Sequence, residues 1–253
     1  MSIIDEFDPH SAPLFTPKQI YGECEPIARI CVVTFHHKVT EKVLSEHSPR
    51  EVAAAFTANG RIPIYRLEKT DPAILFYMSP IGAPAAGAVL EEVHTLTGAS
   101  HFVVFGSAGV LDSDRCRGKI LIPTESYRDE GLSYHYAPPA DYIRMKNSEK
   151  LADFFSSRGV PYLAGRNWTT DAIYRETVDR IARHRADGCI SVEMEAAGLE
   201  AVADAVGAEL YTFFFDGDIL GERWEIGNIG GEKEKKQQES LFDLALDFAK
   251  TLS

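Results

Sequence analysis

Short apolar runs of strand length alternate along most of the chain with longer stretches of helical periodicity. Such alternation is typical of α/β proteins, in which helices cover a sheet, and it argues against an all-β fold or a helical bundle. The pattern predicts strands over residues 28–34, 73–78, 101–105, 119–122, 160–164, 189–192 and 209–215. It predicts helices over residues 83–96, 148–158, 176–185, 195–206 and 234–252.

Three glycines mark the ends of predicted helices. Gly98, Gly159 and Gly207 each follow a helical pattern and precede a predicted strand. At the C-terminal end of a helix the chain often passes through the left-handed region, which glycine adopts at the least cost. We therefore expect a left-handed conformation at these three positions.

Length and charge limit the class of protein further. With 253 residues, of which 45% are hydrophobic, the chain is long enough to bury a core and short enough for one α/β domain. We expect residues 27–253 to form that domain after an N-terminal extension of residues 1–26. Lysine and arginine total 26 against 38 acidic residues, a net charge of -12, which disfavours binding to nucleic acid.

Cysteine spacing and the N-terminal residues indicate the compartment. The four cysteines form no CxxC pair, so neither a structural zinc site nor a disulfide framework is expected. The first residues carry acidic side chains and prolines in place of the basic patch and apolar run of a signal peptide. No run of 18 apolar residues occurs. We expect a cytoplasmic protein with reduced thiols and no membrane partner.

Two stretches, residues 125–142 and 216–231, break the alternation. The first is rich in tyrosine and proline, and the second in glycine and charged residues. Long irregular segments within a compact domain are usually functional or disordered, and the tyrosines favour order in the first. The polar residues 232–239 that follow are expected to form a solvated first turn of the last helix.

A carboxylate pair stands where a predicted strand passes into an apolar helix. Glu193 and Glu195 flank Met194 at the edge of a buried layer. Burying these carboxylates is unfavourable unless they accept hydrogen bonds, and two carboxylates with a thioether between them suit the hydroxyl groups and face of a sugar. The alternative is a helix N-terminus whose acidic residues interact favourably with the helix dipole.

A turn of small residues is predicted where the strand at 101–105 ends. Gly106, Ser107 and Gly109 would expose backbone N–H groups and a hydroxyl there, and such groups bind anions. Residues 78–82 end the preceding strand in a similar way, so both turns would face one crevice at the carboxyl edge of the sheet. The alternative is a turn that serves only close packing.

Four segments together resemble the nucleoside phosphorylase family, which comprises the uridine and purine nucleoside phosphorylases and related nucleosidases. Residues 191–203 (SVEMEAAGLEAVA) resemble its ribose-binding signature, the most specific of the four. Residues 128–139 (RDEGLSYHYAPP) are similar to a uridine phosphorylase segment, and residues 105–112 (FGSAGVLD) to the glycine-rich loop. Residues 168–177 (WTTDAIYRET) resemble the segment that lines the base pocket.

The resemblance implies a fold and a reaction. The fold would be a single α/β domain with a twisted central mixed β-sheet flanked by helices, assembled into dimers or hexamers in which a neighbour completes each active site. Inorganic phosphate, as co-substrate, would attack C1′ of a nucleoside and give free base and ribose 1-phosphate without a cofactor. Because negative charge develops on the base and positive charge on the sugar, the site needs a donor to the base and acceptors for the diol.

The resemblance also implies roles for individual residues. Glu193, Met194 and Glu195 match the family's ribose ligands. Asp218 stands where purine-specific members place the aspartate that protonates the base. Gly217 replaces the serine that usually precedes that aspartate, so Asp216 is the alternative, and an acidic surface loop is a third interpretation.

The expected phosphate site departs from the family pattern. Residues 34–39 (TFHHKV) replace a cluster of glycine, aspartate, proline and arginine, and Val104 replaces a second arginine. The candidates that remain are Gly106, Ser107, Arg61 and His37. Arg61 aligns with an arginine that a neighbouring subunit contributes, whereas the alternative for His37 is an ordinary surface position.

The base pocket is expected in the segment that precedes the ribose signature. Trp168 and Tyr174 are candidates to stack on a base, since aromatic faces bind heterocycles. Asp171 and Arg175 are candidates to pair with its edge or with each other. A tryptophan at the edge of the core is the alternative for Trp168. The residues with which uridine phosphorylases bind uracil have no counterpart at the matching positions, and Asp218 favours a purine.

We therefore expect an enzyme that cleaves the N-glycosidic bond of a nucleoside with phosphate as the nucleophile. The first alternative is a nucleosidase that uses water activated by a carboxylate, which the altered phosphate positions favour. The second is a nucleoside-binding protein that keeps the ribose site without turnover. None of these functions requires a metal, because the leaving base needs only a proton.

Overall fold

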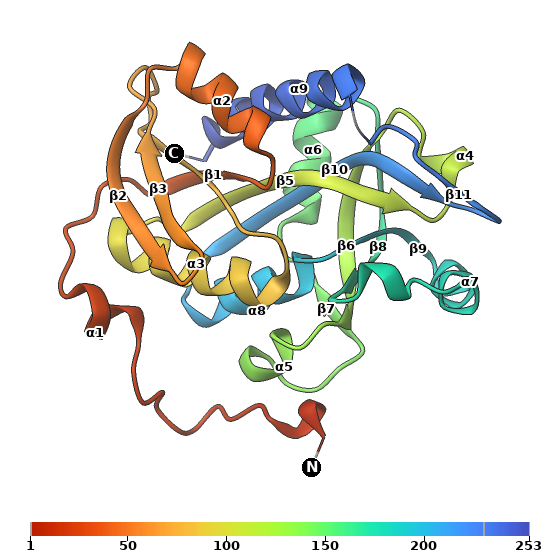
Figure 1. Ribbon diagram of the computed structural model, residues 1–253, viewed down its shortest axis with the longest axis horizontal. Coiled ribbons are helices and arrows are strands. Elements are labelled where there is room, and N and C mark those ends of the chain that lie inside the picture. Colours follow the sequence, from red (N-terminus) through yellow and green to blue (C-terminus); the bar gives the residue numbers. More distant parts are fainter. Residues whose placement is uncertain (1, 230, 253) are drawn as a thin grey trace.

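An 11-stranded mixed sheet forms the centre of the computed structural model, which describes residues 2–229 and 231–252 (Figure 1). Its strands are β1 (Ile30–Thr34), β2 (Arg50–Thr57), β3 (Gly60–Arg66), β4 (Ile74–Met78), β5 (His101–Val110), β6 (Ile120–Asp129), β7 (Tyr142–Arg144), β8 (Tyr162–Thr170), β9 (Cys189–Glu193), β10 (Glu209–Leu220) and β11 (Trp224–Glu225). The helices are α1 (Pro17–Tyr21), α2 (His37–Glu46), α3 (Ala83–Thr97), α4 (Ser113–Cys116), α5 (Ser133–Tyr136), α6 (Ser148–Ser157), α7 (Val178–Ala186), α8 (Ala196–Ala205) and α9 (Gly231–Ala249), with 3-10 turns η1 (Ile3–Asp5) and η2 (Ile173–Arg175).

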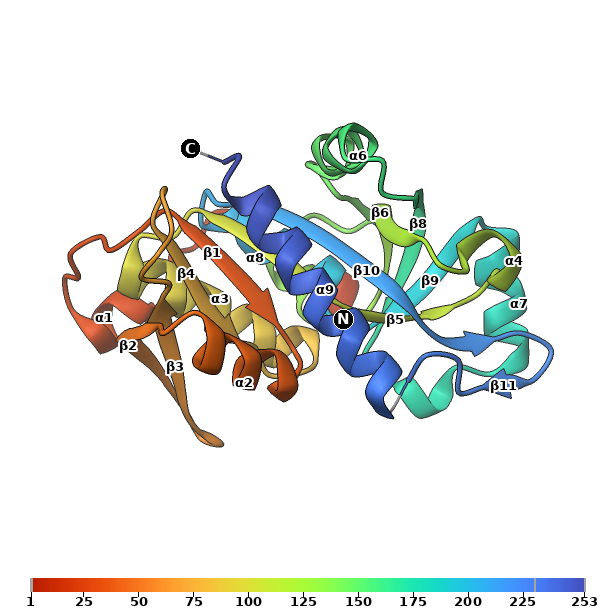
Figure 2. The same cartoon turned by 90° about the horizontal axis from the view of Figure 1, so that it is seen from above.

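Part of the sheet closes on itself. β10 pairs in parallel with β5 and antiparallel with β6. β6, β8 and β9 follow as parallel neighbours, and β9 pairs antiparallel with β5. These strands form a ring, from which β1, β4, β3 and β2 extend as an open, twisted sheet (Figure 2). The predicted fold class, a twisted mixed sheet flanked by helices, is confirmed.

Helices cover both faces of the sheet because the side chains of each central strand alternate between two buried layers. In β1, Cys31 and Val33 pack in one cluster with residues of α3 and α8. Ile30 and Val32 pack in a second cluster with α2, α6 and α9. Burial of each such aliphatic side chain contributes roughly 1.5–3 kcal/mol, so the strands that carry the site are anchored from both sides.

The predicted strands and helices are present, but several strands extend further than predicted. One longer region was missed, as were the short elements α1, α4, α5, β7 and β11. β5, β6, β8 and β10 run on through segments expected as turns or loops, because neighbouring strands of the ring continue to pair there. α2 and the β2–β3 hairpin lie between residues 37 and 66, where no element was predicted. Their apolar signal is weak because only Val39 and Val43 are buried in α2, and only Ala54, Ala55 and Ile64 are buried in the hairpin. Gly98, Gly159 and Gly207 adopt φ of 72, 64 and 71°, as predicted.

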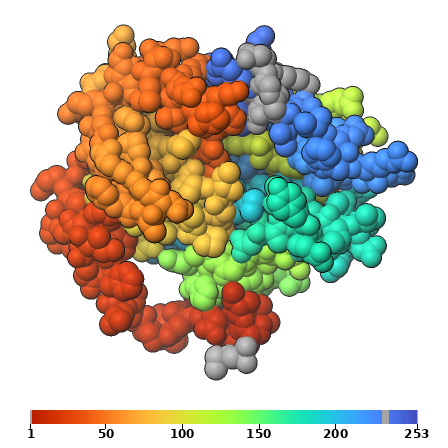
Figure 3. All heavy atoms as spheres, viewed as in Figure 1, coloured from red at the N-terminus to blue at the C-terminus, as the bar shows by residue number. Residues whose placement is uncertain are grey.

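Residues 2–26 lie along the surface below the sheet, and none of them is buried (Figure 3). The Tyr21 hydroxyl attaches this segment by donating to Glu92 Oε2 at 2.7 Å and accepting from the Phe56 N–H at 3.1 Å. Whether residues 1–26 behave as a separate extension stays a prediction. Within the described residues no helix is long and apolar enough to cross a bilayer, and the four cysteines are free thiols.

Candidate active site

A cavity of about 160 Å³ lies beyond the carboxyl ends of β1 and β9, beside the distal parts of β5 and β10. Its lining residues are Phe35, Ile81, Gly106, Ser107, Gly109, Ile173, Glu176, Val192, Glu193, Met194, Glu195, Asp218 and Gln238. The structure therefore brings together the three predicted ribose residues, two of the predicted phosphate residues and the predicted acid. Apolar walls with a few converging polar groups are typical of small-molecule sites.

Glu193, the last residue of β9, uses its carboxylate within the protein. Its Oε2 accepts from the backbone N–H groups of Glu195 and Ala196, both at 2.7 Å. Its Oε1 accepts from Asn167 Nδ2 at 2.7 Å and from Thr169 Oγ1 at 2.5 Å. Burial raises the pKa of Glu193, and these four donors oppose the shift. Glu193 thus anchors the first turn of α8, where a negative charge is favoured.

Glu195 stands just before α8 and keeps more of its hydrogen-bonding capacity for a ligand. Its Oε1 accepts from the Gly82 N–H at 2.6 Å, and the backbone of Met194 also stabilises the carboxylate. A carboxylate offers roughly four acceptor positions, so acceptors remain for a diol. Burial, followed by the charge of Glu193, raises the pKa of Glu195 to about 8. Gly82 ends the segment 78–82, which reaches this cavity as predicted.

A buried polar network beneath the cavity holds Glu193, and sequence reasoning did not identify it. Asn167 Nδ2 donates to Ser126 Oγ at 2.8 Å, and Asn167 Oδ1 accepts from Ser191 Oγ at 2.8 Å. Thr169 Oγ1 accepts from the Ala197 N–H at 3.1 Å. Networks of this kind fix side-chain geometry when every member has a partner. Their residues come from β6, β8 and β9, so only strand pairing brings them together.

The glycine-rich segment is an extended strand and not the predicted turn. Gly106 and Ser107 pair with Phe214 and Phe215 of β10, so β5 continues to Val110. Gly109 is required by close packing, because a Cβ there would lie 2.6 Å from Leu220 Cδ1. Gly106 and Ser107 do line the cavity, but the backbone nest that was expected to bind an anion is absent from this segment.

Asp218 faces the cavity, whereas Asp216 does not line it. A break in strand register between Asp216 and Ile219 interrupts the alternation of β10. Asp216 lines a different cavity, of about 350 Å³, and its Oδ2 accepts from the Gly118 N–H at 3.1 Å. Trp224 Nε1 on β11 donates to Asp218 Oδ2 at 2.8 Å. The hydrogen bond fixes the carboxyl group of Asp218 at the edge of the substrate cavity.

Two further polar residues, which sequence reasoning missed, line the cavity. Glu176 lies between η2 and α7, where burial and then the charge of Asp218 raise its pKa to about 7 against the opposing charge of Arg180. Gln238 of α9 is 3% exposed, and its Oε1 has no hydrogen-bond partner in the described part of the chain. Glu176 belongs to a segment already noted for its resemblance, but Gln238 lies in a polar stretch that was expected to be solvated.

Arg61 and His37, the two predicted cationic phosphate ligands, lie away from the cavity. Arg61 on β3 forms an ion pair with Glu51 on β2. His37 is exposed at the start of α2 and stacks on His36, with ring centroids 5.0 Å apart. The helix start explains this placement, because His36 Nδ1 accepts from the Lys38 N–H at 3.1 Å and so caps α2.

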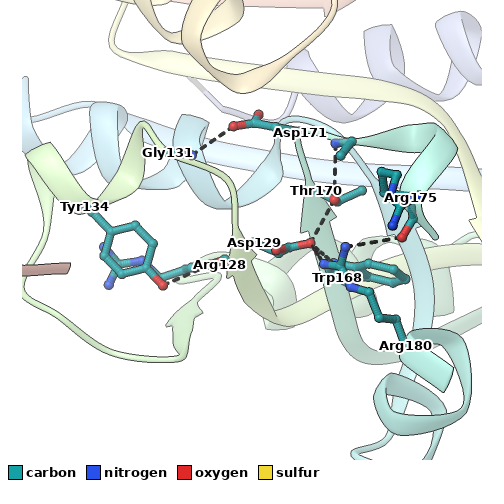
Figure 4. Close-up of polar contacts among 10 residues, drawn as sticks. Arg128, Asp129, Gly131, Tyr134, Trp168, Thr170, Asp171, Arg175 and Arg180 are labelled. Atoms are coloured by element: carbon teal, nitrogen blue, oxygen red, sulfur yellow. Dashed lines mark hydrogen bonds and ion pairs between the residues drawn. The ribbon is translucent and has the colours of Figure 1, made fainter. Parts of the chain in front are cut away.

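Trp168 belongs to the core beside the cavity and does not line it (Figure 4). Its ring is fully buried and stacks on His184, with centroids 4.1 Å apart. Trp168 Nε1 donates to Asp129 Oδ2 at 3.0 Å, and the same oxygen accepts from Thr170 Oγ1 and Arg180. The alternative interpretation of Trp168, a tryptophan at the core edge, describes this geometry.

The other predicted base ligands also lie outside the cavity. Tyr174 is 95% exposed, and Arg175 is exposed beside it. Asp171 accepts from the Gly131 N–H at 3.0 Å through Oδ2 (Figure 4). Ile173, from the centre of the same segment, contributes an apolar wall to the cavity, and whether the segment binds a base stays a prediction.

The segment 128–139 is organised by its own arginine. Arg128 is buried, and its guanidinium donates to Ser133 Oγ at 2.8 Å and to the carbonyl oxygens of Ala137, Pro138 and Ala140. Its Cζ lies 4.1 Å from the ring centroid of Tyr134 (Figure 4). The arginine, serine and tyrosine of this motif therefore hold a loop in place. Among the described residues, no three His, Cys, Asp or Glu side chains converge to hold a metal ion.

The chain is similar to known proteins along most of its length. The family model described as Phosphorylase superfamily matches residues 29–239. A DeoD-type purine nucleoside phosphorylase from Exiguobacterium sp. is 25% identical over 179 residues, covering 67% of this chain and 71% of that protein. A second, from Caldanaerobacter subterraneus subsp. tengcongensis, is 25% identical over 177 residues, covering 67% and 73%.

Two solved structures share the fold. The AMP nucleosidase from Bacteroides thetaiotaomicron superposes with a TM-score of 0.70 at 16% identity, covering 89% of both chains. The 5'-methylthioadenosine/S-adenosyl homocysteine nucleosidase from Campylobacter jejuni gives a TM-score of 0.71 at 16% identity, covering 89% of this chain and 100% of the other.

Proposed function

Because the chain belongs to the phosphorylase superfamily and is an enzyme of the nucleoside phosphorylase and nucleosidase type, we propose that it hydrolyses the N-glycosidic bond of a purine nucleoside. Water, and not phosphate, would be the nucleophile, and the products would be free base and ribose. The observation that carries this proposal is that no lysine, arginine or histidine stands among the described residues that line the cavity. Four carboxyl groups line it, and the two cationic phosphate ligands expected from the sequence lie elsewhere.

Electrostatics disfavour phosphate in this cavity. Two like charges 4 Å apart repel by about 4 kcal/mol at the effective dielectric constant of about 20 that suits protein sites. Glu193 accepts four hydrogen bonds in the manner of an ionised carboxylate, and a phosphate ion below the sugar would approach its charge. Water and a neutral nucleoside meet no such repulsion.

The lining residues supply what glycosidic cleavage needs. Glu195 offers acceptors to the ribose diol, and Met194 offers a thioether to its face. The carboxyl groups also stabilise the positive charge that develops on the sugar as the bond breaks. Ile173 and Val192 provide apolar surface for a heterocycle, and the acidic side chains beyond them provide the proton for the leaving base.

A purine is supported by the chemistry of the acid and by the relatives. Purine bases leave more readily when a ring nitrogen is protonated, and Asp218 and Glu176 are the acidic groups away from the ribose motif. The names of both phosphorylases and both solved nucleosidases refer to purine nucleosides or nucleotides.

A product assay tests the proposal. Adenosine, inosine, guanosine and uridine would each be incubated with the enzyme, with and without inorganic phosphate, and the base and sugar products separated by chromatography. We expect free ribose from a purine nucleoside at a rate that phosphate does not change. Ribose 1-phosphate formed at a rate that rises with phosphate would refute water as the nucleophile.

Phosphorolysis is the second candidate, and one observation favours it. Arg61 lies on the β2–β3 hairpin, which projects from the body of the molecule (Figure 2). In a dimer, Arg61 of a second copy would bring a cation to the cavity of the first. A phosphate-dependent rate that is lost in Arg61→Ala would establish this arrangement.

A further inference from the structure

We propose that Glu176 is the acid that protonates the departing base, and that Glu176 and Asp218 together bind the edge of a 6-aminopurine. The proposal rests on the proposed function, since it requires a nucleoside in the cavity. The sequence resemblance pointed to Asp218 as the proton donor, with Asp216 as the alternative. The geometry points to a pair of carboxyl groups with different roles.

Glu176 is placed to donate a proton. Its side chain is half-buried, lines the cavity beside Ile173, and forms no hydrogen bond to any other described residue. A carboxyl group that has no hydrogen-bond partner among the described residues is available to a ligand. The charged groups that face it are Asp218 on β10 and Arg180 on α7, while Glu193 and Glu195 line the same cavity.

Asp218 is placed to accept. The indole N–H of Trp224 donates to Asp218 Oδ2 at 2.8 Å, and an N–H donor suits an ionised carboxylate oxygen. Arg180, the cation that faces Glu176, is engaged by Asp129 and by the Arg175 carbonyl. Burial together with the Asp218 charge raises the pKa of Glu176 to about 7. About half of the Glu176 carboxyl groups therefore carry a proton at pH 7.

One donor and one acceptor match adenine better than other purines. Adenine presents N7 as an acceptor beside the 6-amino donor, whereas guanine presents two acceptors, N7 and O6, on that edge. Hypoxanthine has the same 6-oxo group and therefore also presents two acceptors. Glu176 would donate to N7 and Asp218 would accept from the amino group, while O6 would face a carboxylate unfavourably. The substrate class is therefore a 6-aminopurine ribonucleoside.

The step balances without a further reactant. The C1′–N9 bond breaks and its electron pair moves into the base, while the proton of Glu176 is transferred to N7. The oxygen of water forms the new bond to C1′ and releases a proton to solvent. Glu176 then recovers a proton from solvent before the next cycle.

The experiment compares Glu176→Gln with the parent on two substrates across pH 5 to 9. Adenosine needs a protonated leaving group, whereas p-nitrophenyl riboside does not. We expect kcat/KM of the parent on adenosine to fall as pH rises through about 7. Glu176→Gln should lose about 100-fold or more on adenosine, the usual range for a general acid, and its pH dependence in that region should disappear. Its loss on p-nitrophenyl riboside should stay below about fivefold, because that step uses no acid.

Controls separate chemistry from folding. Glu222→Gln makes the same change at an exposed position outside the cavity and should match the parent. Glu176→Asp keeps an acid and should retain the fall in activity with pH. Carbon-13 NMR of glutamate-labelled protein should show the carboxyl groups of Glu176 and Glu200 titrating near pH 7. The Glu176 signal should be missing in Glu176→Gln and present in Glu222→Gln, while the Glu200 signal should remain in both.

Several results would overturn the proposal. They are an adenosine rate in Glu176→Gln within threefold of the parent, a retained pH dependence, or equal losses on both substrates. A parent that prefers inosine to adenosine would refute the 6-aminopurine assignment. Formation of ribose 1-phosphate would refute water as the nucleophile but not the role of Glu176. Phosphorolysis of the same nucleoside also needs an acid, so the comparison of variants would remain valid.

Discussion

Glu193 and Glu195 are two residues apart, yet the structure predicts opposite consequences for the same substitution. In Glu193→Gln, the amide oxygen can still accept hydrogen bonds from the backbone N–H groups of Glu195 and Ala196. The new NH2 group then faces Asn167 Nδ2, itself a donor. The variant therefore loses one buried hydrogen bond and weakens the others by removing the charge.

The magnitude follows from these contacts. Hydrogen bonds to charged groups contribute about 1.5–3 kcal/mol and neutral ones about 0.5–1.5 kcal/mol. Losing one charged bond and neutralising the rest gives about 2–4 kcal/mol, which is partly offset because a buried charge is removed. For a chain of this size each kcal/mol lowers Tm by about 2–4 °C. Glu193→Gln should therefore melt roughly 4–16 °C below the parent.

Glu195→Gln is the matched comparison. It keeps a carbonyl oxygen for the Gly82 N–H and should melt within about 2 °C of the parent. Its kcat/KM on a ribonucleoside should fall by about 2–4 kcal/mol of transition-state binding, because the positive charge that develops on the sugar favours the ionised carboxylate and the amide cannot ionise. Thermal melting and initial rates at pH 7 test both. A Glu193→Gln variant as stable as the parent, or a Glu195→Gln variant as active, would refute the division of roles.

Three further predictions concern other buried or exposed charges. Glu200 is 2% exposed and burial raises its pKa to about 7, so the parent loses stability as pH rises from about 4.5, the unfolded value, through 7. Glu200→Gln should therefore be more stable than the parent at pH 8.5, by on the order of 3 kcal/mol, and equal to it at pH 4, as measured by denaturant unfolding. Arg128→Met should lower the free energy of unfolding by about 3–5 kcal/mol, because it leaves the carbonyl groups of its loop without donors; an unchanged denaturation midpoint would contradict this. If Arg61 completes a neighbour's site for phosphorolysis, mixing Arg61→Ala with Glu195→Gln should restore the phosphate-dependent activity that each variant alone lacks, and no recovery after subunit exchange would show that each site is self-contained.

The core strands could be predicted because they are apolar on both faces. β1, for example, reads ICVVT and is buried along its whole length, so its sequence alone marks it as a central strand. The missed elements have the opposite character. β2 and β3 expose much of their surface, and β3 contains Pro63, so neither hydrophobicity nor alternation distinguishes them from a loop.

Glu176 and Gln238 show why part of the site could not be predicted. Glu176 lies just before α7, and Gln238 lies in the polar N-terminal half of α9, so the sequence favours a solvated position for both. Gln238 is buried only because α9 packs over the face formed by β1 and β5, a contact between segments far apart in the chain. Local composition contains no information about such burial. The segment that carries Glu176 was identified, but not the residue within it that lines the cavity.

The carboxylate pair shows where spacing stops being informative. Residues i and i+2 of a continuous strand point to the same side, so the motif suggested two equivalent ligands for a sugar. In the structure β9 ends at Glu193, and Glu195 has φ of -135° and ψ of -35° just before α8. The chain turns between the two residues, so Glu193 faces Asn167 and Thr169 while Glu195 meets Gly82. Asn167 and Thr169 lie on β8, whose parallel pairing with β9 places Thr169 opposite Glu193. The different roles of the two glutamates therefore depend on a neighbouring strand whose register the motif does not encode.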